Sequence, residues 1–124
     1  MPLKILVIDD DADNRLILKY ILQNAGFVVE EAADGPTGLA VADRGGFSLI
    51  VLDVMLPKMD GWQVCRTLKA DAKTKSIPVL ALTGRDRAID EMQGYESGVD
   101  QYLTKPINPE KFLKAVKEIL KFST

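Results

Sequence analysis

Five short strand-like runs, each followed by a helical pattern, constrain the fold of this chain more than any other feature. The runs are residues 3–8, 27–32, 49–52, 77–82 and 101–104. Continuous apolar runs, as at 49–52, are typical of strands buried on both faces of a parallel sheet. Strands that alternate with helices predict an α/β fold, in which right-handed crossovers place helices on both faces of one five-stranded parallel sheet.

The expected helices lie between and after these strands. They cover residues 14–25, a short segment opened by 34–36, residues 60–70, residues 86–97, and a last segment from Pro109 to about residue 122. The helix at 86–97 has the thinnest apolar face and an internal Gly94, so we expect it to shift most easily. Neither repeats nor linkers interrupt the pattern, which predicts a single domain over residues 1–124 without an output domain.

The composition excludes several classes of protein. A net charge of −2 without a polybasic run argues against direct nucleic-acid binding and against membrane attachment. No run approaches the ~18 apolar residues of a membrane span. One cysteine, Cys65, permits no internal disulfide, which fits the cytoplasm. The absence of histidine removes Ser-His and Cys-His catalysis, histidine-ligated zinc and a phosphohistidine carrier.

Polar residues follow four of the five strands. Asp9 and Asp10 follow the first, Asp53 the third, Thr83 the fourth and Lys105 the fifth. Ligands of open parallel sheets bind beyond the carboxyl ends of the strands. Three nearby carboxylates repel one another unless a cation intervenes, and Mg²⁺ prefers such oxygen ligands. Alone, each residue has a simpler explanation as a turn, a helix cap or a surface charge, but together they predict phosphoryl transfer to an aspartate.

These motifs resemble the receiver domains of bacterial two-component response regulators. The resemblance rests on Asp9-Asp10, on LDVMLPKMDG at 52–61, on ALTG at 81–84 and on YLTKP at 102–106. It covers nearly the whole chain and implies a flavodoxin-like sheet with strand order 2-1-3-4-5. The pattern runs to about residue 122 with no linker after it, which favours a stand-alone receiver domain over a piece of a longer regulator.

The resemblance also implies a phosphoacceptor and a metal site. Asp53 corresponds to the aspartate that accepts the phosphoryl group. Asp10 corresponds to a direct ligand of Mg²⁺, and Asp9 to a carboxylate that helps to hold the ion, partly through water. Asp53 itself and the backbone carbonyl of Met55 complete the implied ligand set.

Three further roles follow from the same resemblance. Lys105 corresponds to the lysine that pairs with Asp53 at rest and with the phosphoryl group afterwards. Thr83 corresponds to the switch hydroxyl, and Tyr102 to the aromatic ring that reports its movement. We also predict a cis Lys105–Pro106 bond, because Lys105 has to turn back toward Asp53 and X-Pro bonds are the usual place for a cis link.

The implied function is a phosphorylation-dependent signalling switch with Mg²⁺ as its cofactor. Its partners would be a histidine kinase or a histidine phosphotransfer protein, which must be external because this chain has no histidine, and a downstream effector protein. The effector would read a surface built from the helix at 86–97, the fifth strand and the last helix. Such a domain is regulatory and not an enzyme, beyond self-catalysed phosphorylation and slow autodephosphorylation.

Three other functions are compatible with parts of this pattern. A phosphatase of the haloacid dehalogenase type needs a second acid two residues after the nucleophile, where this chain has Met55. A flavodoxin-like cofactor binder needs a phosphate-binding loop after the first strand, but the sequence DDDAD there repels phosphate. A receiver fold kept as an unphosphorylated docking module remains open, although the complete set of site residues argues against it.

Overall fold

The computed structural model describes residues 2–56, 59–84 and 98–123, and the side chains up to residue 121. Its five strands are β1 (Lys4–Ile8), β2 (Val28–Ala32), β3 (Leu49–Asp53), β4 (Val79–Thr83) and β5 (Gln101–Thr104). All four neighbouring pairs are parallel, and the spatial order is β2-β1-β3-β4-β5. The predicted parallel sheet and its strand order are therefore confirmed.

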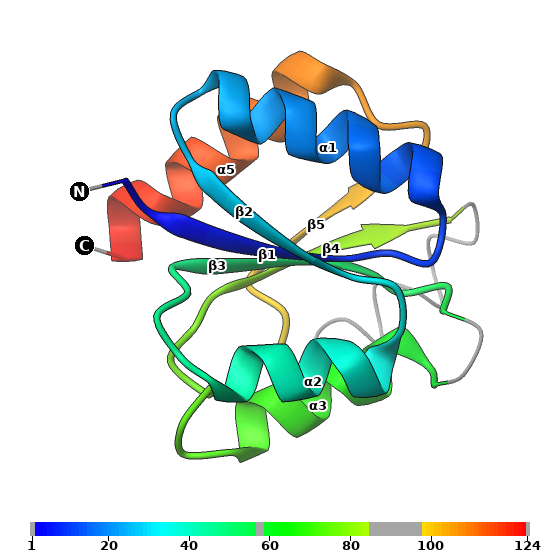
Figure 1. The fold of residues 1–124 in the computed structure, drawn as a ribbon, viewed down its shortest axis with the longest axis vertical. Coiled ribbons are helices and arrows are strands. Elements are labelled where there is room, and N and C mark those ends of the chain that lie inside the picture. The colour runs from blue at the N-terminus through cyan, green and yellow to red at the C-terminus, as the bar shows by residue number, and fades with distance from the viewer. Residues whose placement is uncertain (1, 57–58, 85–97, 124) are drawn as a thin grey trace.

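Helices cover both faces of the sheet (Figure 1). One layer holds α1 (Ala12–Asn24) and α5 (Pro109–Ser123), and the other holds α2 (Gly35–Asp43) and α3 (Gly61–Ala70). Both chain ends lie at the same side of the molecule, where β1 begins. The helix expected at residues 86–97 lies outside the described residues. In the part of the chain that is described, no helix combines the length and the apolarity needed to cross a bilayer.

The three central strands bury both of their faces. Successive side chains of a strand point to opposite faces, so Leu6 and Ile8 join the core beneath α2 and α3, while Ile5 and Val7 join the core beneath α1 and α5. Burying one such side chain stabilises the fold by about 1.5–3 kcal/mol. Alternation between two cores explains why these strands read as continuous apolar runs.

Some element boundaries differ from the expected ones, for local reasons. Helix α1 begins two residues early because Asp11 caps it, its side chain accepting a bond of 2.9 Å from the backbone N–H of Asp13. Strand β4 begins two residues late, at Val79, because Pro78 has no N–H to donate to a neighbouring strand. Strand β3 continues one residue further than expected and ends on Asp53 itself.

Candidate phosphorylation site

Asp53 is the last residue of β3 and lies at the centre of the site. Its side chain is only 2% exposed. The backbone N–H of Met55 donates to its Oδ1 at 2.9 Å, and the Lys105 ammonium donates to its Oδ2 at 2.9 Å. Both carboxylate oxygens are therefore partnered, which offsets much of the cost of burying the charge.

Lys105 reaches Asp53 from the far end of the chain. Its backbone N–H donates to the carbonyl of Thr83 at 2.8 Å, and this bond continues the β4–β5 ladder by one residue. The Lys105–Pro106 bond is cis, and the chain leaves the sheet there. The ion pair thus joins residues 52 positions apart.

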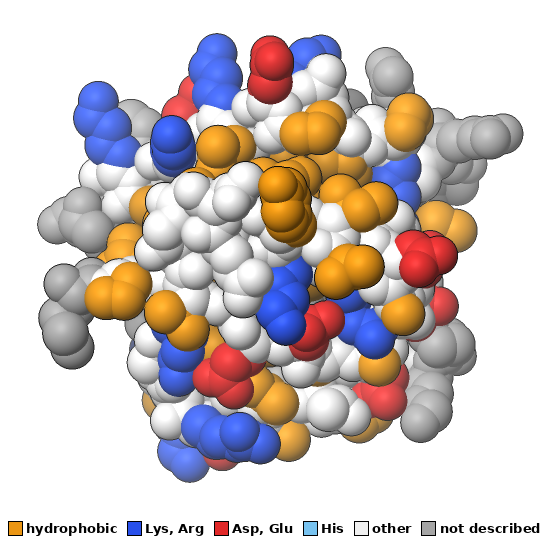
Figure 2. Space-filling model, turned by 45° about the horizontal axis from the view of Figure 1, so that its top comes forward, with side chains coloured by type: hydrophobic (Ala, Val, Ile, Leu, Met, Phe, Trp, Pro, Cys, Tyr) orange, Lys and Arg blue, Asp and Glu red, His pale blue; other side chains and the backbone are white. Residues whose placement is uncertain are grey.

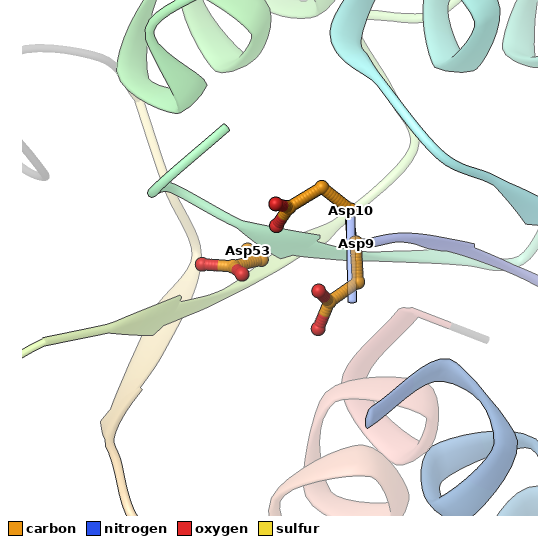
Figure 3. Close-up of side chains that lie close together, drawn as sticks. All are labelled: Asp9, Asp10 and Asp53. Atoms are coloured by element: carbon orange, nitrogen blue, oxygen red, sulfur yellow. The ribbon is translucent and has the colours of Figure 1, made fainter. Parts of the chain in front are cut away.

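Asp9 and Asp10 bring two more carboxyl groups to Asp53 from the end of β1 (Figure 3). One ligand oxygen from each of the three residues lies within 4.8 Å of the others. Asp9 is buried and Asp10 is exposed. Asp9 Oδ1 accepts a bond of 2.9 Å from the Asp11 N–H, whereas its buried Oδ2 has no hydrogen-bond partner among the described residues.

The environment of Asp9 favours its neutral form. Burial is the largest of the causes that raise the pKa of Asp9 to about 6; the negative charge of Asp53 also raises this pKa, whereas the Asp11 N–H and the Lys105 ammonium lower it. A buried acceptor without a partner costs free energy, and so does a buried carboxylate beside another. A cation at this position would relieve both.

These residues fit a hard divalent cation. Three carboxylates converge from two strand ends, and one of them offers an unpartnered, buried oxygen. Mg²⁺ takes such oxygen ligands and keeps several waters, which the exposed Asp10 leaves room for. Met55 lies two residues after Asp53, in the segment that follows β3. The role of its backbone carbonyl as a metal ligand stays a prediction.

Thr83 and Tyr102 share one face of the sheet. Thr83 ends β4 and is 1% exposed; its hydroxyl lies 3.5 Å from the carbonyl oxygen of Leu103, a long hydrogen bond. Tyr102 is half-buried and pairs with Ala81 in the parallel ladder. Ala81 and Thr83 are two residues apart on β4, so Thr83 projects to the same face as Tyr102.

A cleft of about 260 Å³ opens beside the acidic residues, between α1 and the connection from β5 to α5. Asp9 and Lys105 line it together with apolar side chains such as Ile17, Ile21 and Ile107. Figure 2 turns α1 and its layer toward the viewer and shows hydrophobic side chains gathered over this face beside charged ones. No local pattern in the sequence indicates this cleft.

Arg15 is a second feature that the sequence analysis missed. Its guanidinium Nη1 donates to the backbone carbonyl of Asp9 at 2.6 Å, and its Nε donates to Glu31 at 3.3 Å. The available signal was an arginine one turn into the helix that follows the acidic run, together with an acid at the end of the second strand.

Comparisons with known proteins agree with this geometry. A family model described as "Response regulator receiver domain" matches residues 5–117. The DNA-binding dual master transcriptional regulator RpaA of Synechocystis is 45% identical over 121 residues, which are 98% of this chain and 50% of that protein. The chain therefore spans about half the length of this relative.

Solved structures extend the match to the fold. The chemotaxis protein CheY4 of Vibrio cholerae superposes with a TM-score of 0.90 at 34% identity, over 96% of this chain and 99% of that one. The receiver domain of a sensor histidine kinase from Pseudomonas aeruginosa, with a magnesium ion coordinated in its active site cleft, superposes with a TM-score of 0.90 at 25% identity, over 98% of this chain and 99% of that one. The chain therefore belongs to the response regulator receiver domain family.

Proposed function

We propose that Asp53 accepts a phosphoryl group from an external phosphohistidine protein and that this modification switches the domain between two states. The observation that carries this proposal is the buried Asp53 carboxylate, which is held by Lys105 at 2.9 Å and faces two further acids. A buried nucleophile with a movable cation beside it suits transfer of an anionic group. The receiver family to which the chain belongs is regulatory.

The transfer is a displacement at phosphorus. One Asp53 oxygen forms the new O–P bond while the bond from phosphorus to the donor imidazole nitrogen breaks, and that nitrogen takes a proton. Asp9, Asp10, Asp53 and the Met55 carbonyl would hold Mg²⁺, which supplies positive charge next to the phosphoryl oxygens. Lys105 exchanges its carboxylate partner for a phosphoryl oxygen, so that its charge follows the group that is transferred.

The switch reaches the surface through Thr83 and Tyr102. A phosphoryl group on Asp53 offers oxygens to the Thr83 hydroxyl, whose present bond at 3.5 Å is weak and cheap to exchange. Its movement frees space on the sheet face that Tyr102 shares, and Tyr102 turns into it. The surface that an effector protein reads would then comprise the segment at 86–97, β5 and α5.

The phosphohistidine donor would approach over α1. Leu16, Ile17 and Tyr20 are 65%, 55% and 66% exposed, a set of apolar side chains beside the cleft that Asp9 and Lys105 line. Apolar patches of this kind mark sites of protein contact. Because the cleft leads to the acceptor, a partner on this face would place its histidine near Asp53.

The proposal also covers the location of the domain and the kind of partner it binds. We propose a cytoplasmic domain that acts through protein partners without touching nucleic acid itself, in keeping with its net charge of −2. The longer relative RpaA is a DNA-binding transcriptional regulator.

The test is intact mass after incubation with acetyl phosphate and Mg²⁺. The wild-type protein should gain one phosphoryl group, Asp53→Asn should gain none, and Asp10→Ala should gain it slowly because its metal site is impaired while its acceptor remains. An unchanged wild-type mass with acetyl phosphate and with several phosphohistidine donors would contradict the proposal and favour an unphosphorylated docking module.

A further inference from the structure

Arg15 connects the acidic turn after β1 to the edge strand β2. Its Nη1 donates to the backbone carbonyl of Asp9 at 2.6 Å, and its Nε donates to Glu31 Oε1 at 3.3 Å. The side chain is only 18% exposed, which is low for an arginine at the surface. The other Glu31 oxygen accepts a bond of 3.1 Å from Lys19, and no hydrogen bond joins Lys19 to the acidic turn in the described part of the chain. Arg15 is thus anchored at Glu31 and directed at Asp9.

The bonds of Arg15 belong to a set that surrounds the turn. The N–H of Asp9 donates to the carbonyl of Ala32 at 3.1 Å, so β2 also holds the other side of this residue. The N–H of Asp11 donates to Asp9 Oδ1 at 2.9 Å, and the N–H of Arg15 donates to the Asp11 carbonyl at 3.0 Å. Arg15 therefore holds the turn at its first residue through the guanidinium and at its third through the backbone.

This placement matters for the direction of the acidic side chains. Asp10 lies between the two residues that Arg15 holds and is itself exposed, so its carboxylate direction depends on the backbone around it. Without the guanidinium, the Asp9 carbonyl loses a charge-assisted bond, and the peptide that joins Asp9 to Asp10 is held less firmly by the bonds that remain around the turn. Outer contacts of this kind commonly orient the groups that bind a metal.

We propose that Arg15 is a positioning residue for the metal site: anchored by Glu31, it holds the turn so that Asp9 and Asp10 face Asp53. This inference rests on the proposed binding of Mg²⁺ to these acids. Electrostatics alone predicts the opposite effect, because a cation near the site repels Mg²⁺ and its removal should tighten binding. The sign of the change in affinity therefore separates positioning from charge.

The test measures the Kd for Mg²⁺ by titration calorimetry at pH 7.5. Arg15→Gln should raise the Kd about tenfold. The matched control is Lys19→Gln, which removes the same charge from the same Glu31 without touching Asp9, and it should leave the Kd unchanged or slightly lower. Glu31→Gln should weaken binding less than Arg15→Gln, because Arg15 keeps its bond to Asp9 but loses its anchor. Arg15→Lys should recover part of the affinity, since one ammonium reaches either Asp9 or Glu31 but does not span both.

Urea unfolding without metal accompanies each titration, so that only folded variants are compared. If Arg15→Gln does not fold, Glu31→Gln and Arg15→Lys carry the test. Folded Arg15 variants that bind Mg²⁺ as well as the wild type, or more tightly, would overturn this inference while leaving phosphorylation at Asp53 intact. A wild-type protein that binds no Mg²⁺ would overturn the metal site and this inference together, and the mass measurement on Asp53 would report separately on the acceptor.

Discussion

Asp9 is a buried residue whose charge is costly in the metal-free protein. Burial and the neighbouring Asp53 raise its pKa from 3.8 to about 6. Below pH 3.8 Asp9 is protonated in both the folded and the unfolded chain. Between pH 3.8 and 6 the folded chain binds more protons, so the free energy of unfolding falls as the pH rises through this window. Above pH 6 the loss is complete and amounts to roughly 3 kcal/mol by the usual 1.36 kcal/mol per unit of pKa.

Asp9→Asn should therefore stabilise the metal-free protein at pH 7.5 by about 1–3 kcal/mol, and should change its stability little at pH 4, where the wild-type carboxyl is already neutral. Urea unfolding in the presence of a chelator measures both values. Asp13→Asn is the matched control, because Asp13 is exposed in the first turn of α1. A gain that is equal at the two pH values would contradict the assigned pKa.

Single residues of the site were predictable to different degrees. The strand-end positions of Asp9, Asp53 and Thr83 follow from apolar runs that end abruptly, a local signal. The pairing of Lys105 with Asp53 came from the family resemblance, since nothing local joins residues 52 positions apart. The bond from Arg15 to Asp9 was missed, because it depends on how a side chain crosses from α1 to β2.

Gly61, at the start of α3, packs directly against the backbone of Val54, which follows β3. The N–H of Gly61 donates to the carbonyl of Val54 at 3.1 Å, and a Cβ on Gly61 would lie 2.2 Å from the Cα of Val54. The close atoms of Val54 are backbone atoms, so no side-chain rotation relieves the clash. Since Val54 follows Asp53 directly, displacing it also displaces the acceptor.

Gly61→Ala should therefore lower the free energy of unfolding by about 1–3 kcal/mol and slow phosphorylation by acetyl phosphate. Gly38→Ala is the control, because the atoms nearest to its Cβ would be side-chain atoms of Ile8, from 2.5 Å, and not backbone atoms as at Gly61. It should cost stability without slowing phosphorylation in the folded fraction. Equal phosphorylation rates for folded Gly61→Ala and wild type would show that the loop does not position Asp53.

Helix α1 carries the exposed apolar surface that the donor protein would cover. Ile17→Asp places a charge on a side chain that is 55% exposed and lines the cleft. It should slow phosphoryl transfer from a phosphohistidine protein at least tenfold, an effect of 1.4 kcal/mol or more on the transition state, and should leave acetyl phosphate reactivity unchanged.

Thr67→Asp on α3 is the control for Ile17→Asp, because Thr67 is exposed in the layer on the other side of the sheet. It should affect neither donor. If Ile17→Asp slows both donors equally, the defect lies in the site and not in docking.

For the molecule as a whole, the sheet was predictable because strand and helix alternate without interruption. Apolar runs reveal which strands are central, as with β1, β3 and β4, whose residues are almost all buried. The order 2-1-3-4-5 was taken from the family, because periodicity does not say which strands are neighbours. The starts of α1 and β4 differ by two residues from the expected ones. Capping by Asp11 explains the first difference, and the missing N–H of Pro78 explains the second.

The switch is a property of the whole domain, and beryllofluoride, a mimic of the phosphoryl group on Asp53, tests it. Amide exchange in β5 and α5 should change when beryllofluoride binds, since Thr83 directly follows Leu82, the register partner of Asp53, and shares a sheet face with Tyr102. Helix α1 serves as the internal reference. If β5 and α5 respond no more than α1, the assignment of Thr83 and Tyr102 as the switch is wrong, whatever happens at Asp53.

The central claim is that Asp53 is the residue that receives the phosphoryl group, and chemical trapping tests it most directly. Borohydride reduces an acyl phosphate to an alcohol, which converts a phosphorylated aspartate to homoserine. After phosphorylation by a phosphohistidine donor with Mg²⁺ and reduction, peptide mass spectrometry should find homoserine at position 53 and nowhere else. Homoserine at position 9 or 10, or an unmodified peptide around residue 53 despite a gain in intact mass, would contradict the account.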